Sequence, residues 1–259
     1  MFRHVCFRFL TESIHRPESL AMPRKSSINR KGHCAGGVEN TDGWIHLAHT
    51  HEEVQQRLLK NESKQRQYAV DYFWNKNLEN LNIFPTRHAL DSWNVHKYFE
   101  LFNKIFFFGA LTKDFCELKF VEELGVSREE WRRNSTHDDA EGYTTDPRRR
   151  LFYQGRTKIS IFEQKDDVSK ATLLRRYLGT LLHEMIHAFI HIYICLPPSC
   201  EAQTAQLEGS SGHGITWHRL AKAFEEFAGN WLGLELDLGR ADVESELGNG
   251  KSDFPAVDS

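Results

Sequence analysis

The most constraining feature of this sequence is an apolar segment, residues 171–195, that also carries two histidines and a glutamate. Apolar residues lie on nearly every side of a helix drawn over this segment, so we expect it to be buried in a core. His183 and His187 are four residues apart and therefore lie on one helix face, where both imidazoles can reach a single ion. The segment predicts a buried helix that carries half of a metal site.

Glu184 directly follows the first histidine and completes the pattern His-Glu-x-x-His. This spacing places a carboxylate beside the metal without making it a ligand, so it can take a proton from a water activated there. The alternative is a set of core histidines satisfied by ordinary hydrogen bonds. Buried histidines and a buried glutamate need partners, because an unpaired buried polar group is costly. A zinc ion would supply those partners, and the pattern predicts a metal-dependent hydrolase with Zn2+ as its cofactor.

A catalytic zinc ion has three protein ligands and an open position for water, so a third ligand is required. The candidates are His191, His213 and His218. His191 lies about 12 Å along the helix axis from His183 and cannot readily converge on the same ion. His213 stands between two glycines, where the backbone can turn closely toward the metal helix. His218 falls one turn into the next helix and is expected near the site or at the surface.

Three short stretches have the pattern of β-strands. Residues 115–122 alternate between apolar and polar side chains, as in a half-buried strand, and residues 142–145 and 158–162 predict two further strands. The connection between the last two is rich in arginine: Arg148, Arg149, Arg150 and Arg156. Such a run is most simply a solvated loop, and the sharper interpretation is a patch that contacts phosphates or an acidic substrate.

Capping residues predict where the helices begin and end. Ser169 is a plausible N-cap of the metal helix. A second helix begins at Ser92, carries an aromatic stripe that we interpret as core, and ends at Gly109. Residues 50–53 form a capping box that opens a polar helix through Lys60 and onward. The thin apolar stripe of that helix predicts an appendage.

The sequence predicts four parts: a disordered extension (1–49), a helical appendage with a linker (50–90), the metal-binding domain (91–240) and an acidic flexible tail (241–259). The extension mixes proline, serine, glycine and basic residues without periodicity. Four histidines near its end lack the spacing of a metal site, and we expect them to be solvated: His33, His46, His49 and His51.

Composition excludes several classes of protein. With 27% charged and 40% hydrophobic residues the chain has the composition of a soluble protein, and a net charge of -3 argues against wholesale binding of polyanions. Five scattered cysteines without a C-x-x-C pair indicate a reducing compartment and no cysteine zinc ribbon. The longest apolar run, residues 181–196, is too short for a membrane span and carries polar residues, so no membrane partner is expected.

The order and spacing of three motifs resemble the SprT-like family of zinc metalloproteases, which includes the Spartan-type proteases. The motifs are Phe106–Leu111 at the end of the aromatic helix, Leu181–Ala188 around the histidine pair, and Gly212–Gly214 followed by the aromatic Trp217. The resemblance covers residues 93–234. It implies an α+β, zincin-like metalloprotease domain with a small antiparallel sheet packed on the metal helix.

By this resemblance His183, His187 and His213 would be the zinc ligands, and Glu184 would be the general base. The resemblance implies a zinc-dependent endopeptidase that acts on DNA-associated or DNA-crosslinked proteins in the nucleus, with the cytoplasm as the alternative compartment. DNA would contact the arginine patch. The alternative function is a zinc-stabilised, catalytically weak module that binds DNA or chromatin. The donor that stabilises the oxyanion is not identified, and Tyr143 and His218 are the residues to try.

Overall fold

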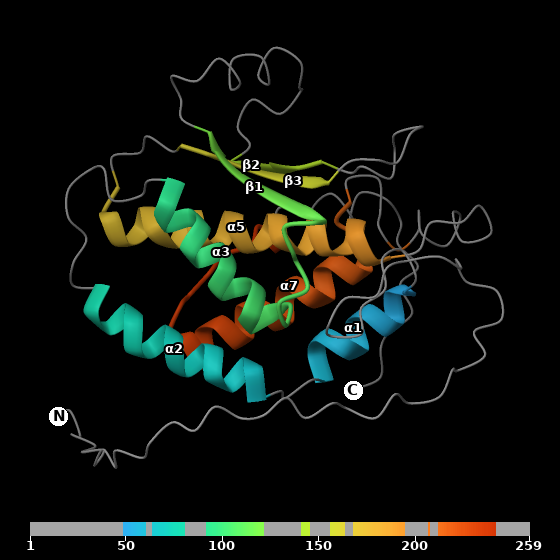
Figure 1. Ribbon diagram of the computed structural model, residues 1–259, viewed down its shortest axis with the longest axis horizontal. Coiled ribbons are helices and arrows are strands. Elements are labelled where there is room, and N and C mark those ends of the chain that lie inside the picture. Colours follow the sequence, from blue (N-terminus) through green and yellow to red (C-terminus); the bar gives the residue numbers. More distant parts are fainter. Residues whose placement is uncertain are drawn as a thin grey trace. The chain divides into compact units, whose positions relative to one another are not determined.

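The computed structural model describes residues 49–60, 64–80, 92–121, 141–145, 156–163, 168–194, 207 and 212–241. All of them belong to the larger of two compact units, Gly32–Ser259. The helices are α1 (His51–Lys60), α2 (Lys64–Asn80), α3 (Ser92–Phe106), α5 (Lys170–Tyr193) and α7 (Ile215–Leu232) (Figure 1). Within these ranges no helix combines the length and apolar character that crossing a membrane requires. Residues 1–48, the arginines at 148–150 and residues 242–259 lie outside the described residues.

Three strands form one mixed sheet in the order β1–β3–β2, with β1 at Cys116–Val121, β2 at Gly142–Thr144 and β3 at Thr157–Phe162. β2 pairs antiparallel with β3, whereas β1 pairs parallel with it. The protein is therefore α+β, as predicted, but the prediction of an antiparallel sheet is wrong for the β1–β3 pair. An alternating pattern predicts a strand, but it predicts neither which strand pairs with it nor whether the pairing is parallel or antiparallel. Parallel pairing needs a long connection, and residues 122–156 provide it.

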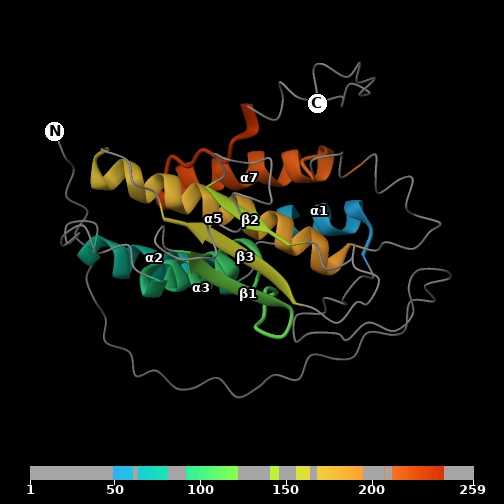
Figure 2. The same cartoon turned by 90° about the horizontal axis from the view of Figure 1, so that it is seen from above.

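The sheet packs on α5, as predicted. α5 contacts β2 and β3 on one side, and it also contacts α3 and α7. In Figure 1 the sheet lies above α5, and Figure 2 shows α3 and α7 on opposite sides of that helix. Ile159 and Ile161 are fully buried while Lys158 between Thr157 and Ile159 is exposed, so one face of β3 enters the core. α5 is consequently covered on several sides, which suits its apolar surface.

The boundaries of α5 follow from its sequence. The Thr172 N–H donates to the Ser169 hydroxyl (3.2 Å), which confirms Ser169 as the N-cap. Around the histidine pair the apolar side chains are at most 1% exposed: Leu181, Leu182, Met185, Ile186 and Phe189. A helix packed in this way around the histidine pair is a rigid platform for the polar side chains it carries.

An aromatic cluster fixes α3 and α7 against α5. The ring of Phe107 lies 5.3 Å from Phe189 of α5 and 5.4 Å from Phe224 of α7, and Phe106 lies 4.8 Å from Phe224. Aromatic rings prefer tilted or edge-to-face arrangements, and such pairs stabilise a fold by more than the apolar area they bury accounts for. The prediction that the aromatic stripe belongs to the core is confirmed. The cluster also sets the position of α7 and hence of the loop that precedes it.

The chain leaves α3 through a short polar clamp. The backbone N–H groups of Phe107 and Gly109 both donate to the Asn103 carbonyl. The Asn103 side chain pairs with both the N–H and the C=O of Leu111, each at 3.0 Å. Gly109 has φ 82°, a conformation that glycine adopts without strain. The predicted stop at Gly109 is confirmed, with the last helical residue at Phe106.

α1 begins with the predicted capping box. The Glu53 N–H donates to the Thr50 hydroxyl (3.1 Å), and the Thr50 N–H donates to the Glu53 carboxylate (3.0 Å). Val54 and Leu58 of this helix and Phe73 of α2 belong to the same hydrophobic core as the aromatic cluster. Both helices contact α7.

His49 and His51 are buried, with exposed fractions of 1% and 6%, so the expectation that they are solvated is wrong. The His49 N–H donates to the carbonyl of Tyr193 at the end of α5 (3.1 Å). His51 Nδ1 lies 2.8 Å from the hydroxyl of Thr216, which is 165 residues further along the chain. Partners so distant in sequence leave no local pattern.

Candidate metal centre

Three imidazoles converge beside α5. The Nε2 atoms of His183 and His187 are 3.1 Å apart, and the Nε2 atom of His213 lies 3.1 Å from the first and 3.0 Å from the second. The first two come from adjacent turns of α5, as the spacing of four residues predicts. The three nitrogens, which we call the Nε2 triangle, lie close enough together to bind one metal ion.

Two glycines allow His213 to approach α5. Gly212 has φ 83°, and a Cβ atom placed on it would meet the His187 ring at 3.4 Å. Gly214 is the N-cap of α7, with an extended backbone. The loop therefore turns tightly against the first two imidazoles immediately before α7 begins. The proposal from sequence that flanking glycines aim this imidazole inward agrees with the geometry.

The residues of the Nε2 triangle fit a zinc ion. A tetrahedral zinc ion with bonds of about 2.0–2.1 Å holds its ligand nitrogens about 3.3 Å apart, close to the observed separations. Three imidazole nitrogens at hydrogen-bonding distance cannot all be satisfied by protons, because at least one of the three pairs must join two donors or two acceptors. A cation at the centre would accept a lone pair from all three. Imidazole is a ligand that suits zinc among the transition metals.

Burial keeps the third imidazole in the form that binds metals. Burial, with a smaller contribution from the neighbouring His183 and His218, lowers the pKa of His213 to about 3. His213 is therefore neutral at physiological pH, which metal ligation requires.

Trp217 forms a wall behind all three imidazoles. Its side chain is fully buried, and its ring lies 4.8 Å from His183, 5.8 Å from His187 and 4.6 Å from His213. The indole meets His183 and His213 edge to face and stacks on His187. Trp217 stands in the first turn of α7, four residues after His213, so one short segment supplies the third imidazole and the surface behind all three.

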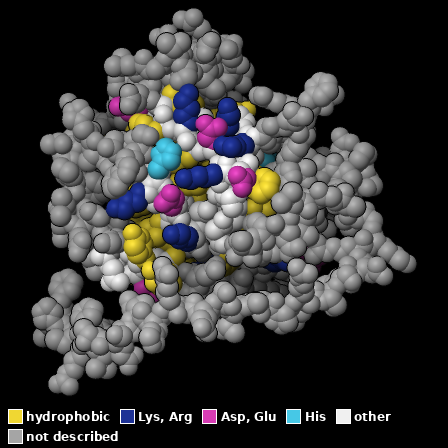
Figure 3. Space-filling model, viewed as in Figure 1, with side chains coloured by type: hydrophobic (Ala, Val, Ile, Leu, Met, Phe, Trp, Pro, Cys, Tyr) yellow, Lys and Arg dark blue, Asp and Glu magenta, His cyan; other side chains and the backbone are white. Residues whose placement is uncertain are grey.

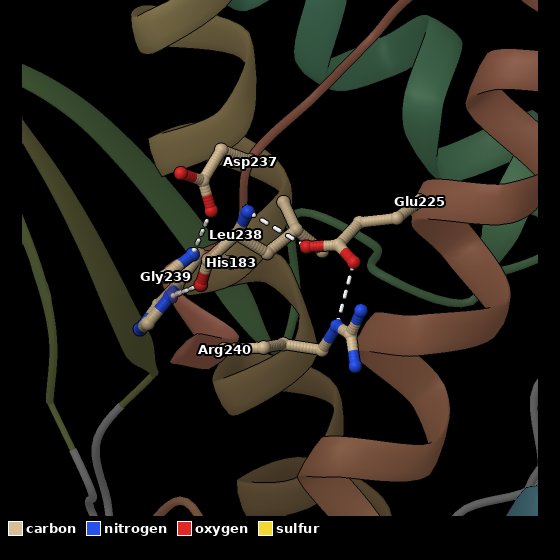
Figure 4. A network of polar contacts seen from close by, with 6 residues as sticks. All are labelled: His183, Glu225, Asp237, Leu238, Gly239 and Arg240. Carbon is tan, nitrogen blue, oxygen red and sulfur yellow. Dashed lines mark hydrogen bonds and ion pairs between the residues drawn. The ribbon is translucent and has the colours of Figure 1, made fainter. Parts of the chain in front are cut away.

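The backbone of the C-terminal segment fixes the tautomer of His183. Its Nδ1 atom lies 2.9 Å from the carbonyl oxygen of Leu238 (Figure 4). A carbonyl can only accept, so Nδ1 carries the proton, and in the neutral ring Nε2 keeps its lone pair for a metal. This contact was not predicted from the sequence. The alternation of Leu234, Leu236 and Leu238 with acidic residues is the signal that could have revealed an extended, half-buried segment here.

Glu184 is buried against the edge strand β2. Its side chain is 6% exposed, and a Cβ atom on Gly142 would lie 2.9 Å from the Glu184 Cγ and 3.2 Å from Oε1. The hydroxyl of Thr144 donates to the Glu184 main-chain carbonyl (3.1 Å). Burial raises the pKa of the Glu184 carboxyl, while the neighbouring His183 and the Thr144 side chain oppose that rise. A carboxyl in such surroundings is suited to accepting and returning a proton.

No family model, curated protein or solved structure matches this chain. The chemistry of the site is therefore assigned from its own residues. Among the described residues, the three imidazoles are the only group of histidine, cysteine or acidic side chains close enough together to hold a metal ion.

The remaining candidates lie around this centre. His191 is one turn further along α5, with its ring 6.1 Å from that of His187, and it does not join the group of three, as the helical geometry predicts. His218 is half-buried and packs edge to face on Trp217 (5.5 Å), so it is a neighbour of the site. Tyr143 is 42% exposed on β2. A role for Tyr143 or His218 at the oxyanion stays a prediction.

The described part of the arginine patch is Arg156, which is exposed at the start of β3. On the face shown in Figure 3, basic side chains are interspersed with acidic ones. The other three arginines of the patch lie outside the described residues, so contact with nucleic acid stays a prediction.

Proposed function

We propose that this protein is a zinc-dependent endopeptidase of the SprT-like type, with His183, His187 and His213 as the metal ligands and Glu184 as the general base. The observation that carries the proposal is the Nε2 triangle, with separations of 3.0–3.1 Å. Beside it lies the buried carboxyl of Glu184, on the helix that supplies two of the three imidazoles. A purely structural zinc site would be closed by a fourth protein ligand, whereas three ligands leave a position for chemistry.

The residues divide the chemistry between them. Bound zinc would polarise the scissile carbonyl and lower the pKa of the attacking water. Glu184 takes the proton released as that water attacks and returns it to the leaving amide nitrogen. Its burial against β2 limits competing contact of the carboxylate with bulk water. Trp217 and the Leu238 carbonyl hold the imidazoles in the orientation that ligation needs.

The proposed substrates follow from the family resemblance. They are proteins bound or crosslinked to DNA, and the proposed compartment is the nucleus. Exposed Arg156, together with Arg148, Arg149 and Arg150, is the proposed contact for DNA.

A metal assay combined with a cleavage assay tests the proposal. The full chain should hold about one zinc ion and should cleave casein or histones, measured with and without single-stranded DNA. Glu184→Gln should retain zinc and fold while losing about 10²–10⁴-fold in rate, the usual contribution of a general base. Zinc loss in this variant, or undiminished cleavage, would contradict the role of Glu184.

His191→Gln is the control on the same helix, because it replaces a polar side chain that lies outside the Nε2 triangle. It should keep both zinc and activity. A wild-type protein that binds zinc and DNA but cleaves neither substrate would instead support the alternative, a zinc-stabilised binding module.

A further inference from the structure

We propose that Glu225 of α7 is a positioning residue that controls metal affinity from outside the site, by holding the backbone that orients His183. It acts through the C-terminal strap, which we define as residues 233–240. The inference rests on the proposed metal centre. It adds a residue that neither touches the metal ligands nor belongs to any motif considered above.

The strap is anchored by a side chain that bonds to it twice (Figure 4). The Glu225 carboxylate accepts a hydrogen bond from the Leu238 N–H through Oε1 (2.9 Å) and forms an ion pair with Arg240 through Oε2 (2.6 Å). Both Glu225 and Arg240 are largely shielded, with side chains 16% and 29% exposed. An ion pair with these shielded, short contacts is stronger than a solvated one.

The N–H and the C=O of Leu238 therefore serve different partners. The N–H is held by Glu225, while the C=O accepts from His183 Nδ1 (2.9 Å). A carboxylate on α7 is in this way linked to an imidazole on α5 by a single residue of the strap. The charge-assisted bond at the Leu238 N–H and the ion pair with Arg240 hold the backbone on both sides of the Leu238 carbonyl, and that carbonyl orients the His183 ring.

The strap is also pressed against α5 close to His183. A Cβ atom on Gly179 would lie 2.5 Å from the carbonyl oxygen of Asp237, a separation that real Cβ atoms do not show. Gly179 is one turn before His183 on the same helix. Leu234, Leu236 and Leu238 are buried, which holds the strap down along its length. The Asp237 side chain accepts from the Gly239 N–H (2.8 Å) and turns the chain directly after Leu238.

Two independent variants test the strap. Glu225→Ala removes both anchoring contacts, and Gly179→Ala forces the strap away from α5 while leaving Glu225 unchanged. Their matched controls are Glu226→Ala, an exposed glutamate next along α7, and Gly229→Ala, a glycine of α7 whose added Cβ would meet nothing within 4 Å. Glu225→Gln keeps an acceptor for the Leu238 N–H and should fall between wild type and Glu225→Ala.

The first measurement is the dissociation constant of the full chain for Zn2+ itself, determined by competition with a chromophoric chelator. We expect both strap variants to bind zinc about 10–100-fold more weakly, the usual effect of losing an outer partner of a histidine ligand. The two controls should bind as the wild type does. Thermal unfolding of the zinc-free proteins identifies any variant that fails to fold, in which case the other strap variant decides.

The second measurement is the 15N chemical shift of the His183 ring in the zinc-free protein. Wild type should show the Nδ1–H tautomer, and the strap variants should lose that preference. Strap variants with wild-type zinc affinity and tautomer would overturn the inference while leaving the proposed function intact. Wild-type protein that binds zinc tightly but cleaves nothing would contradict the peptidase while the strap prediction stands. If wild type binds no zinc, the affinity role of the strap falls together with the metal centre.

Discussion

The two sides of the metal centre are built in opposite ways. On one side, His183 and His187 stand on adjacent turns of a helix that is buried along this stretch, so helical geometry alone places them on one face. On the other side, His213, Trp217 and Leu238 come from a glycine loop, a helix start and an extended strap, and each must be held by contacts distant in sequence. The helical side is local and robust, and the other side depends on completed tertiary structure.

The largest expected effect tests whether both sides contribute equally to metal binding. His187→Ala and His213→Ala should each weaken zinc binding by more than about 100-fold, because losing even an outer partner of a ligand costs about 10–100-fold. Peptidase activity should disappear in both. Isothermal titration with Zn2+ measures the effect. Retained zinc in His213→Ala would show that His183 and His187 suffice for binding and that the two sides do not contribute equally.

The next effect concerns Trp217, which belongs to the side of the site built from distant segments. Trp217→Ala removes a fully buried indole and should lower the free energy of unfolding by about 3–5 kcal/mol. Trp217→Phe should lose less, since a ring remains behind the imidazoles. Chemical denaturation of the zinc-free proteins gives the difference. Equal free energies of unfolding for Trp217→Ala and wild type would mean that the packing of this indole does not stabilise the protein.

A smaller effect is expected where β2 meets the helical side. Gly142→Ala would place a Cβ atom 2.8 Å from Thr180 Cγ2 and 2.9 Å from Glu184 Cγ, so the strand or the carboxyl must move. Overpacking of this kind costs about 1–3 kcal/mol. Peptidase rate should fall while zinc affinity stays, because the imidazoles are not touched. Gly229→Ala is the control and should not destabilise, as its added atom meets open space.

The smallest effect should come from a residue that belongs to neither side of the site. Thr50→Ala removes the hydroxyl half of the capping box of α1 and should cost about 1 kcal/mol. Zinc affinity and activity should be unchanged, which thermal unfolding and the cleavage assay can establish together. A marked loss of zinc in this variant would show that α1 positions the start of α7 more strongly than its cap implies.

The helical side could be predicted from sequence because its information is periodic and local. The N-cap at Ser169, the burial of α5 and the common face of His183 and His187 all follow from residues within a few turns of one another. His213 could be chosen among three histidines because glycines flank it. The distance of His213 from His183 and His187, however, is set by the packing of α7 on α5.

What the sequence did not reveal is the set of contacts that join distant segments. The parallel pairing of β1 with β3 depends on where a long connection returns the chain to the sheet. The alternation of apolar and polar residues does not indicate whether a strand pairs parallel or antiparallel. The burial of His49 and His51 depends on partners at the end of α5 and the start of α7. The bond from His183 to Leu238 joins residues 55 positions apart, through a main-chain atom that every residue type possesses.

That last bond has a consequence for the order in which the protein matures. During synthesis the chain emerges from its N-terminus, so the helix with the first two imidazoles is available well before the residues that complete the centre. His213 comes later, and Leu238, with Arg240 behind it, comes last. A nascent chain halted between these points would carry the first two imidazoles of the candidate site without the contact that orients His183. We therefore expect the proposed zinc ion to bind fully only after the strap has been synthesised.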